Sequence, residues 1–178
     1  MAVVQNIHNA KHFIRNIDNR LYTGKPVPSL CAMYNMKKMG VTQVIDLRED
    51  AYMYRLFEKF ACYLFGIKYK NIKIDTDTSS IPTMKFFKNI NKTITHNEGK
   101  TYLHCKYGRH RTGMCIAAYE KEVLNKDNIN VYINLTNRFS ELIEQTGNQK
   151  LQKKLETVYQ KFIKKYHLNE APKQNPTK

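Results

Sequence analysis

The sequence lacks several features that would place it in other protein classes. It has no tryptophan, and its four cysteines include no close pair, which argues against a disulfide framework and a zinc site. We therefore expect Cys31, Cys62 and Cys115 to be buried thiols in helices. No apolar run approaches the roughly 20 residues of a membrane span, and the N-terminal apolar stretch is too short for a secretory signal. The default expectation is a cytoplasmic protein without a metal.

Acidic residues are also scarce. The chain has 15 Asp and Glu against 30 Lys and Arg, which gives a net charge of +15. Such a charge favours acidic partners, namely phosphorylated molecules, an anionic membrane surface or RNA. The alternative is a solvated basic surface that follows from a lysine-rich composition. We find no nucleic-acid-binding module with interleaved aromatics, so the basic charge supports a polyanionic partner without defining one.

The most informative segment is the decapeptide at residues 104–113, which reads HCKYGRHRTG. The residues before it are β-branched and apolar, as in a buried strand, and those after it are apolar helix formers. A strand, a tight loop and a helix together present backbone N–H groups to an anion. A thiolate at Cys105 would gain from the same field, so its pKa should be lowered. Arg111 offers a planar fork that matches two phosphate oxygens, so the loop predicts nucleophilic attack on phosphorus.

This decapeptide resembles the His-Cys-(five residues)-Arg-Thr/Ser-Gly signature loop of the cysteine-dependent protein tyrosine and dual-specificity phosphatases. The resemblance implies that Cys105 is the nucleophile and that Arg111 binds the phosphoryl group and stabilises the transition state. It also implies that Thr112 donates a hydrogen bond to the leaving thiolate, and that His104 positions the loop and tunes the cysteine. The other loop positions are expected to bind substrate: Lys106, Tyr107, Gly108, Arg109, His110 and Gly113.

The resemblance extends over about residues 18–165, where it is closest to the atypical dual-specificity phosphatases of plants, fungi and bacteria. Residues 21–26 are similar to their Tyr-x-Ser/Thr-Gly-x-Pro turn, and residues 40–48 to their Gly-Val strand that ends in Asp-Leu-Arg. In the plant and fungal branch the positions of Lys106 and Arg109 are basic, and some members cleave inositol pyrophosphates. The resemblance thus implies a highly charged, non-protein substrate. Tyr107 departs from the small or basic residue expected at its position.

The general acid is less well defined. In the family an aspartate about thirty residues before the cysteine protonates the leaving oxygen, and the loop at residues 74–78 offers Asp75 and Asp77. A gapless alignment of strand ends places the acid between them, at Thr76. Asp75 fits the usual separation from the cysteine slightly better, and Asp77 protrudes further into the loop. The alternative is that both are turn or cap residues. Arg48, at the end of another strand, either orients the signature loop by ion pairing or lies on the surface.

Strand and helix patterns alternate along the chain. They predict strands at 20–24, 41–47, 69–74 and 101–103, and helices at 30–39, 52–65, 82–95, 112–125, 130–145 and 148–166. The alternation indicates an α/β fold, a single domain with a central, mostly parallel sheet of four to five strands flanked by helices. We expect an irregular or weakly helical lead-in at 1–18, a catalytic domain at 19–167 and a disordered basic tail at 168–178.

These features predict a metal-independent phosphatase without a cofactor that hydrolyses phosphate monoesters through a cysteinyl-phosphate intermediate. Its substrates are expected to be phosphoproteins, at Tyr, Ser or Thr, or else inositol phosphates and phosphoinositides. The alternatives are an RNA 5′-triphosphatase and a phospho-ligand-binding module without turnover. The core residues of the loop are all present, so the undefined acid is the one feature that leaves the non-catalytic alternative open.

Overall fold

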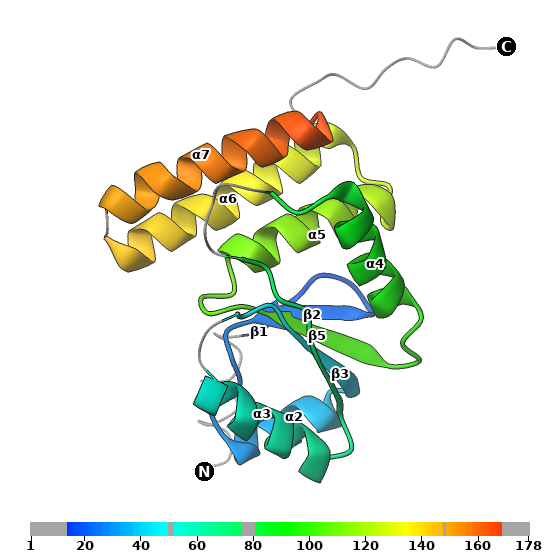
Figure 1. Cartoon of the computed structure of the whole chain (residues 1–178). Coiled ribbons are helices and arrows are strands. Elements are labelled where there is room, and N and C mark those ends of the chain that lie inside the picture. Colours follow the sequence, from blue (N-terminus) through cyan, green and yellow to red (C-terminus); the bar gives the residue numbers. More distant parts are fainter. Residues whose placement is uncertain (1–13, 50–51, 76–80, 148, 169–178) are drawn as a thin grey trace, which may run out of the picture. The chain divides into compact units, whose positions relative to one another are not determined.

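The computed structural model describes residues 14–49, 52–75, 81–147 and 149–168 (Figure 1). They form two compact units, and each is described separately. The first unit contains residues up to 76 together with 92–112, and the second contains 77–91 together with the chain from 113 onward. The signature loop from Cys105 to Thr112 lies wholly within the first unit.

The first unit is built on a five-stranded sheet. Its strands are β1 (Ile14–Asn16), β2 (Leu21–Gly24), β3 (Val41–Asp46), β4 (Lys68–Asn71) and β5 (Lys100–His104), in the spatial order β1-β2-β5-β3-β4. Strand β1 pairs antiparallel with β2, whereas all the other pairs are parallel. The predicted α/β class and mostly parallel sheet are therefore confirmed. Strand β5 is central, so the residue that follows it, Cys105, lies where such sheets bind ligands.

Two helices of this unit, α2 (Leu30–Lys38) and α3 (Tyr52–Leu64), pack against the sheet (Figure 1). Helix α2 begins where the sequence predicts, because the Ser29 hydroxyl accepts a hydrogen bond from the Ala32 N–H. The core between these helices and the sheet consists of Val27, Met33, Met36, Val41, Val44, Ala61, Cys62, Ile67 and Tyr102. It fixes the strand ends from which the signature loop emerges.

The second unit is helical. It contains most of α4 (Met84–Thr95) and of α5 (His110–Glu122), together with α6 (Asn128–Thr146) and α7 (Gln149–Tyr166). Helices α6 and α7 lie side by side and are joined through Gly147, which has a φ of 57° (Figure 1). The Phe87 ring of α4 packs edge-on against Phe162 and Tyr166 of α7, with centroids 5.6 Å away in both cases. None of the helices in the described residues is long and apolar enough to cross a membrane.

Three local expectations were wrong. Residues 14–16, expected to be irregular, form β1, because pairing with β2 stabilises a segment too short to show alternation. Cys31, expected to be buried, is exposed in the first turn of α2. The helical spacing of Leu56, Phe57, Phe60, Ala61 and Leu64 predicts a helix that buries these residues. Helix α3 is present, but only Ala61 of the five is buried, and the other four are exposed. The expectations for residues 1–13 and for the tail from 169 lie outside the described residues.

Candidate active site

The signature loop connects β5 directly to α5. Gly108, at the turn of this loop, has a φ of 65°, a conformation that side-chain-bearing residues rarely adopt. A Cβ at this position would lie 2.1 Å from the carbonyl oxygen of Gly24, at the end of β2. The loop therefore closes against the neighbouring strand only because position 108 has no side chain.

The Cys105 thiol lies inside this loop, with 2% of the residue exposed. Burial alone would raise its pKa, but the pKa is lowered by a hydrogen bond from the Thr112 side chain, by the charge of Arg111, and by the backbone N–H groups of Thr112 and Tyr107. The Thr112 hydroxyl makes no hydrogen bond to a nitrogen or oxygen of the described residues, so it is available to the sulfur. Two main-chain N–H groups, a hydroxyl and a guanidinium thus favour the thiolate, as a nucleophile requires.

Cys62 shows that burial does not produce this effect by itself. It is fully buried in the core beside α3, and burial together with the nearby Glu58 carboxylate raises its pKa to about 12. The two thiols have the same intrinsic chemistry and similar burial, but their pKa values move in opposite directions. The difference lies in the donors that surround Cys105.

Arg111 is held beside the thiol by the ends of two other chain segments. Its Nη1 donates to the carbonyl oxygen of Leu47, just after β3, at 3.2 Å, and to that of Ile74 at 3.5 Å. These contacts with described residues use only Nη1, which leaves Nε and Nη2 to donate to two oxygens of a phosphoryl group. The backbone carbonyl oxygens of two other segments therefore orient the Arg111 guanidinium.

A buried ionic network lies behind the nucleophile. His104 Nε2 lies 3.1 Å from Glu58 Oε1, and Glu58 also accepts a short hydrogen bond from Arg48. Arg48 in turn donates to both Asp46 carboxylate oxygens at 2.9 Å, and the Tyr69 hydroxyl donates to Asp46 at 2.8 Å. Burial lowers the pKa of His104, but the Glu58 and Asp46 carboxylates outweigh it and raise the pKa, which favours the charged imidazolium next to Cys105.

The network shows that Arg48 is a buried ion-pairing residue and does not lie on the surface. It also contains Glu58, which the sequence did not indicate as part of the site. Arg48 is 4% exposed and reaches the signature loop indirectly, through Glu58. Glu58 was missed because it lies within an apolar helical pattern; its signal is that it is the only acid in α3.

The same network contains a group of potential metal ligands. In the described part of the chain, one group of acidic and histidine side chains is close enough together to hold a metal ion. It consists of Asp46, Glu58 and His104, whose possible ligand atoms lie within 4.8 Å of one another. The Arg48 guanidinium already pairs with both carboxylates. The protein therefore supplies the positive charge that these carboxylates need, and the set does not fit a resident metal.

The remaining loop residues differ in their exposure. Lys106 and Tyr107 are exposed, and the Lys106 ammonium lies 5.5 Å above the Tyr107 ring. Arg109 is half-buried and His110 is buried. These four positions add basic and aromatic groups to the loop that holds Cys105, as a polyanionic ligand would require.

Gly113, the last residue of the signature, belongs to the second unit. A Cβ at this position would lie 3.2 Å from the Tyr159 hydroxyl of α7. Position 113 therefore allows close packing of α5 against α7.

Of the two candidate acids, only Asp75 lies in the described part of the chain, and Asp77 lies outside it. Asp75 is exposed and directly follows Ile74, whose carbonyl oxygen binds Arg111. Asp75 is therefore one residue away from a backbone contact of Arg111.

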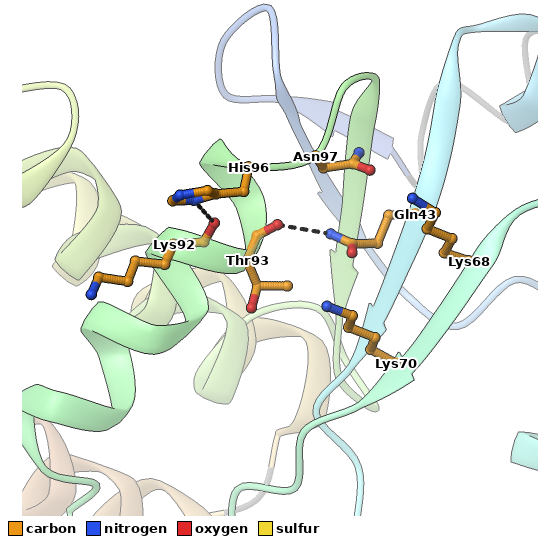
Figure 2. Close-up of a pocket in the computed structure, with 7 residues that line it drawn as sticks. All are labelled: Gln43, Lys68, Lys70, Lys92, Thr93, His96 and Asn97. Carbon is orange, nitrogen blue, oxygen red and sulfur yellow. Dashed lines mark hydrogen bonds between the residues drawn. The ribbon is translucent and has the colours of Figure 1, made fainter.

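A second basic pocket lies elsewhere in this unit (Figure 2). It has a volume of about 370 Å³ and is lined by Gln43, Lys68, Lys70, Lys92, Thr93, His96 and Asn97. Gln43 is held by hydrogen bonds to the Thr93 carbonyl and to the Thr101 hydroxyl. Thr101 precedes Cys105 by four strand residues, about 13 Å along β5. Lys68 and Lys70 lie across from the C-terminal end of α4 (Figure 2), whose carbonyl oxygens favour cations. No residue that lines this pocket belongs to the signature loop, so the pocket is separate from the nucleophile.

The sequence matches a known protein family over most of its length. The model of the family described as "DSP-PTPase phosphatase fused to NAD+ Kinase" matches residues 2–161. The chain belongs to this family. It is a cysteine-dependent phosphatase of the tyrosine and dual-specificity superfamily, as the signature loop predicts. No curated protein matches the sequence.

Solved structures of low sequence identity share the fold of this phosphatase. TpbA of P. aeruginosa in complex with pTyr is 14% identical, with 71% of this chain and 73% of that chain covered and a TM-score of 0.59. The core catalytic domain of the PP-IP phosphatase SIW14 from S. cerevisiae, in complex with citrate, is 13% identical over 89% and 94%, with a TM-score of 0.58. PTPMT1 in complex with PI(5)P is 17% identical over 86% and 99%, with a TM-score of 0.53.

The thiolate environment predicts a pH-dependent reactivity for this phosphatase. Iodoacetamide attacks thiolates, so Cys105 should be alkylated in the wild type at a pH well below that of an ordinary thiol. In Thr112→Val, loss of the hydroxyl donor raises the pKa of Cys105, so the midpoint of the alkylation rate against pH should move upward. Peptide mass spectrometry separates Cys105 from the exposed Cys31. An unchanged midpoint in the variant would contradict the role given to Thr112.

Proposed function

We propose that this phosphatase hydrolyses phosphate monoesters through a covalent cysteinyl-phosphate intermediate, without a metal. The observation that carries the proposal is the surroundings of Cys105. They combine a lowered pKa, two backbone N–H groups directed at the sulfur, and Arg111 beside it. Together these groups can generate the nucleophile and neutralise the equatorial phosphoryl oxygens, so the protein itself supplies the positive field.

The reaction runs in two steps. The Cys105 thiolate attacks phosphorus in line while Arg111 and the loop N–H groups bind the equatorial oxygens, and the bond from phosphorus to the ester oxygen breaks. An aspartic acid, assigned here to Asp75, gives its proton to the departing oxygen. Water then attacks phosphorus and loses a proton to the same aspartate, now a carboxylate, while the S–P bond breaks. This step releases inorganic phosphate and the thiolate, which the Thr112 hydroxyl stabilises.

For the substrate, the loop favours a ligand with several phosphates. Lys106, Arg109 and His110 add basic groups to the charge of Arg111 within six residues. Structures that share the fold include a PP-IP phosphatase and a complex with PI(5)P, which makes inositol phosphates and phosphoinositides the first class to test. The complex of TpbA with pTyr keeps phosphotyrosine as the second class.

The choice between the two acids is tested by separate Asp75→Asn and Asp77→Asn variants. A poor alkyl leaving group needs the proton, whereas p-nitrophenolate does not. We expect Asp75→Asn to lower kcat on an alkyl phosphate by about a hundredfold and on p-nitrophenyl phosphate by much less. The Asp77→Asn variant is the matched control and should retain activity on both. The reverse pattern would transfer the role to Asp77, and two unimpaired variants would remove the aspartate from the mechanism.

A substrate panel tests the proposed function itself. Phosphate release is measured, in the presence of EDTA, from phosphotyrosyl and phosphoseryl peptides, inositol polyphosphates, phosphoinositides and 5′-triphosphate RNA. We expect turnover of the inositol-based substrates that is abolished in Cys105→Ser and kept in Lys68→Ala/Lys70→Ala, which alters only the second basic pocket. Reaction of the phosphopeptides alone would contradict the polyanionic preference. An absence of turnover on every substrate, with binding retained, would point to a phospho-ligand-binding module.

A further inference from the structure

The solvent side of α3 is covered with large apolar side chains. Eight of them are between 42% and 80% exposed, and all but Tyr54 share one side of the helix: Tyr52, Met53, Leu56, Phe57, Phe60, Tyr63 and Leu64. We call this set the α3 apolar face. Soluble proteins rarely leave so many neighbouring apolar side chains in water, and such a surface marks a site of interaction with a protein or a membrane.

The orientation of these residues is the reverse of that in an ordinary surface helix. At about 100° per residue, the α3 apolar face spans an arc of about 140°. The opposite side of the helix carries Glu58, Ala61 and Cys62, which are at most 1% exposed and pack into the first unit. Glu58 of α3 is thus buried in the ionic network, whereas most apolar residues of the helix point to solvent. This is the opposite of the usual amphipathic pattern.

The exposed charges that α3 itself carries beside this face are positive. Arg55 and Lys59 border it, and the only acid in α3 is the buried Glu58, which pairs with Arg48. Helix α2, which lies beside α3, contains no acid and ends in Lys37 and Lys38 (Figure 1).

Helix α2 extends the same surface. It exposes Leu30, Tyr34 and Met39 at its solvent side and its end, and the Tyr34 ring lies 6.0 Å from Phe65, just past α3. An apolar surface on two helices whose exposed charges are basic is complementary to an anionic surface.

A hollow at the edge of the α3 apolar face can receive an anionic group. It has a volume of about 340 Å³ and is lined by Tyr52, Arg55, Leu56, Lys59, Tyr69 and Asn71. Arg55 is held in place there, because its Nη1 donates to the Arg48 carbonyl oxygen and to Asn71 Oδ1. Lys59 is exposed beside it. Two cations thus lie where the apolar face meets polar surface, which is the depth of lipid phosphates for a helix lying in the membrane interface.

We propose that α3 docks this phosphatase on the surface of an anionic phospholipid membrane. The α3 apolar face enters the boundary between headgroups and acyl chains, and Arg55 and Lys59 bind lipid phosphates. The positive charge favours a membrane over two other partners for this face, namely a second copy of the chain and the N-terminal segment at residues 1–13. A second copy would bring the same cations together, and residues 1–13 contain no acid to pair with them. The docking is measured without substrate, so it stands or falls independently of the phosphatase reaction.

Co-sedimentation of the full-length chain with vesicles tests the proposal. We expect it to bind phosphatidylcholine vesicles that contain phosphatidylserine and to bind pure phosphatidylcholine vesicles much more weakly. Phe60→Ser/Tyr63→Ser should weaken binding by about tenfold or more, and Lys59→Glu should weaken it on the anionic vesicles. The matched control is Ile129→Ser/Ile133→Ser on α6, which removes apolar residues of similar exposure (57% and 45%) and should bind like the wild type. Circular dichroism confirms that each variant is folded.

Other outcomes overturn the proposal. A wild type that stays in the supernatant with anionic vesicles excludes membrane docking. If Phe60→Ser/Tyr63→Ser instead converts a dimer into a monomer in analytical ultracentrifugation, with no vesicle binding, the face is an interface between copies. Equal loss of binding in the α6 control would show that the apolar residues act without regard to position. Equal binding to neutral and anionic vesicles would remove the role of Arg55 and Lys59.

Discussion

Replacement of Cys105 by serine is expected to lower kcat by about ten-thousandfold or more. A hydroxyl at this position keeps its proton at neutral pH, because no described group acts as its base, and the donors that lower the pKa of the thiol cannot make an alkoxide available. The shape of the site should persist, since serine has nearly the same volume as cysteine. Substrate binding should therefore survive, and the variant should trap substrate instead of turning it over.

The measurement is phosphate release from the best substrate of the panel, combined with calorimetry of the variant with that substrate. Cys62→Ser is the matched control, because Cys62 is also buried but its pKa is raised to about 12. We expect Cys62→Ser to affect stability and not the chemical step. A Cys105→Ser enzyme that retains more than about a tenth of wild-type kcat would exclude a covalent mechanism at this residue.

The second large effect is expected for Arg111→Lys, which should lower kcat by about a thousandfold. Lysine keeps the positive charge but not the planar fork, and its single ammonium cannot reach the Leu47 carbonyl and two phosphoryl oxygens together. The loss should appear mainly in kcat, because the planar fork fits the equatorial oxygens best in the transition state.

Arg109→Lys provides the comparison for this substitution. Arg109 lies in the same loop and is half-buried. We expect Arg109→Lys to change KM on polyphosphorylated substrates more than kcat. If the two lysine variants lose kcat to the same degree, the loop acts as a diffuse basic surface and Arg111 has no special role in the transition state.

The signature loop could be predicted from the sequence because its information is local. A strand, a glycine at a turn and a helix start all lie within a few residues of Cys105, so the spacing of the motif determines the geometry. The same holds for the start of α2 at Ser29, where a single side chain caps the helix. These features need no knowledge of distant parts of the chain.

The features that escaped prediction depend on distant contacts. Glu58 interacts with His104 across 46 positions of sequence, and no pattern in α3 shows which side of the helix will face that histidine. Once Glu58 and Cys62 are buried, the rotation of α3 is set and its apolar residues must point to solvent. The identity of the general acid could not be predicted either. It lies on a loop, and hydrophobic periodicity does not determine which loop residue comes to lie beside the signature loop.

The covalent mechanism is tested most directly by looking for phosphate on Cys105 during turnover. The Asp75→Asn variant, in which the second step lacks its base, is mixed with p-nitrophenyl phosphate, whose leaving group needs no proton in the first step. The reaction is quenched in denaturant at neutral pH, and the protein is digested for mass spectrometry. We predict that the peptide containing Cys105 gains one phosphoryl group, in an amount approaching one per enzyme molecule, and that Cys105→Ser gains none. Continued release of phosphate with no phosphorylated cysteine at any quench time would mean that water attacks the substrate directly, and the proposed mechanism would be wrong.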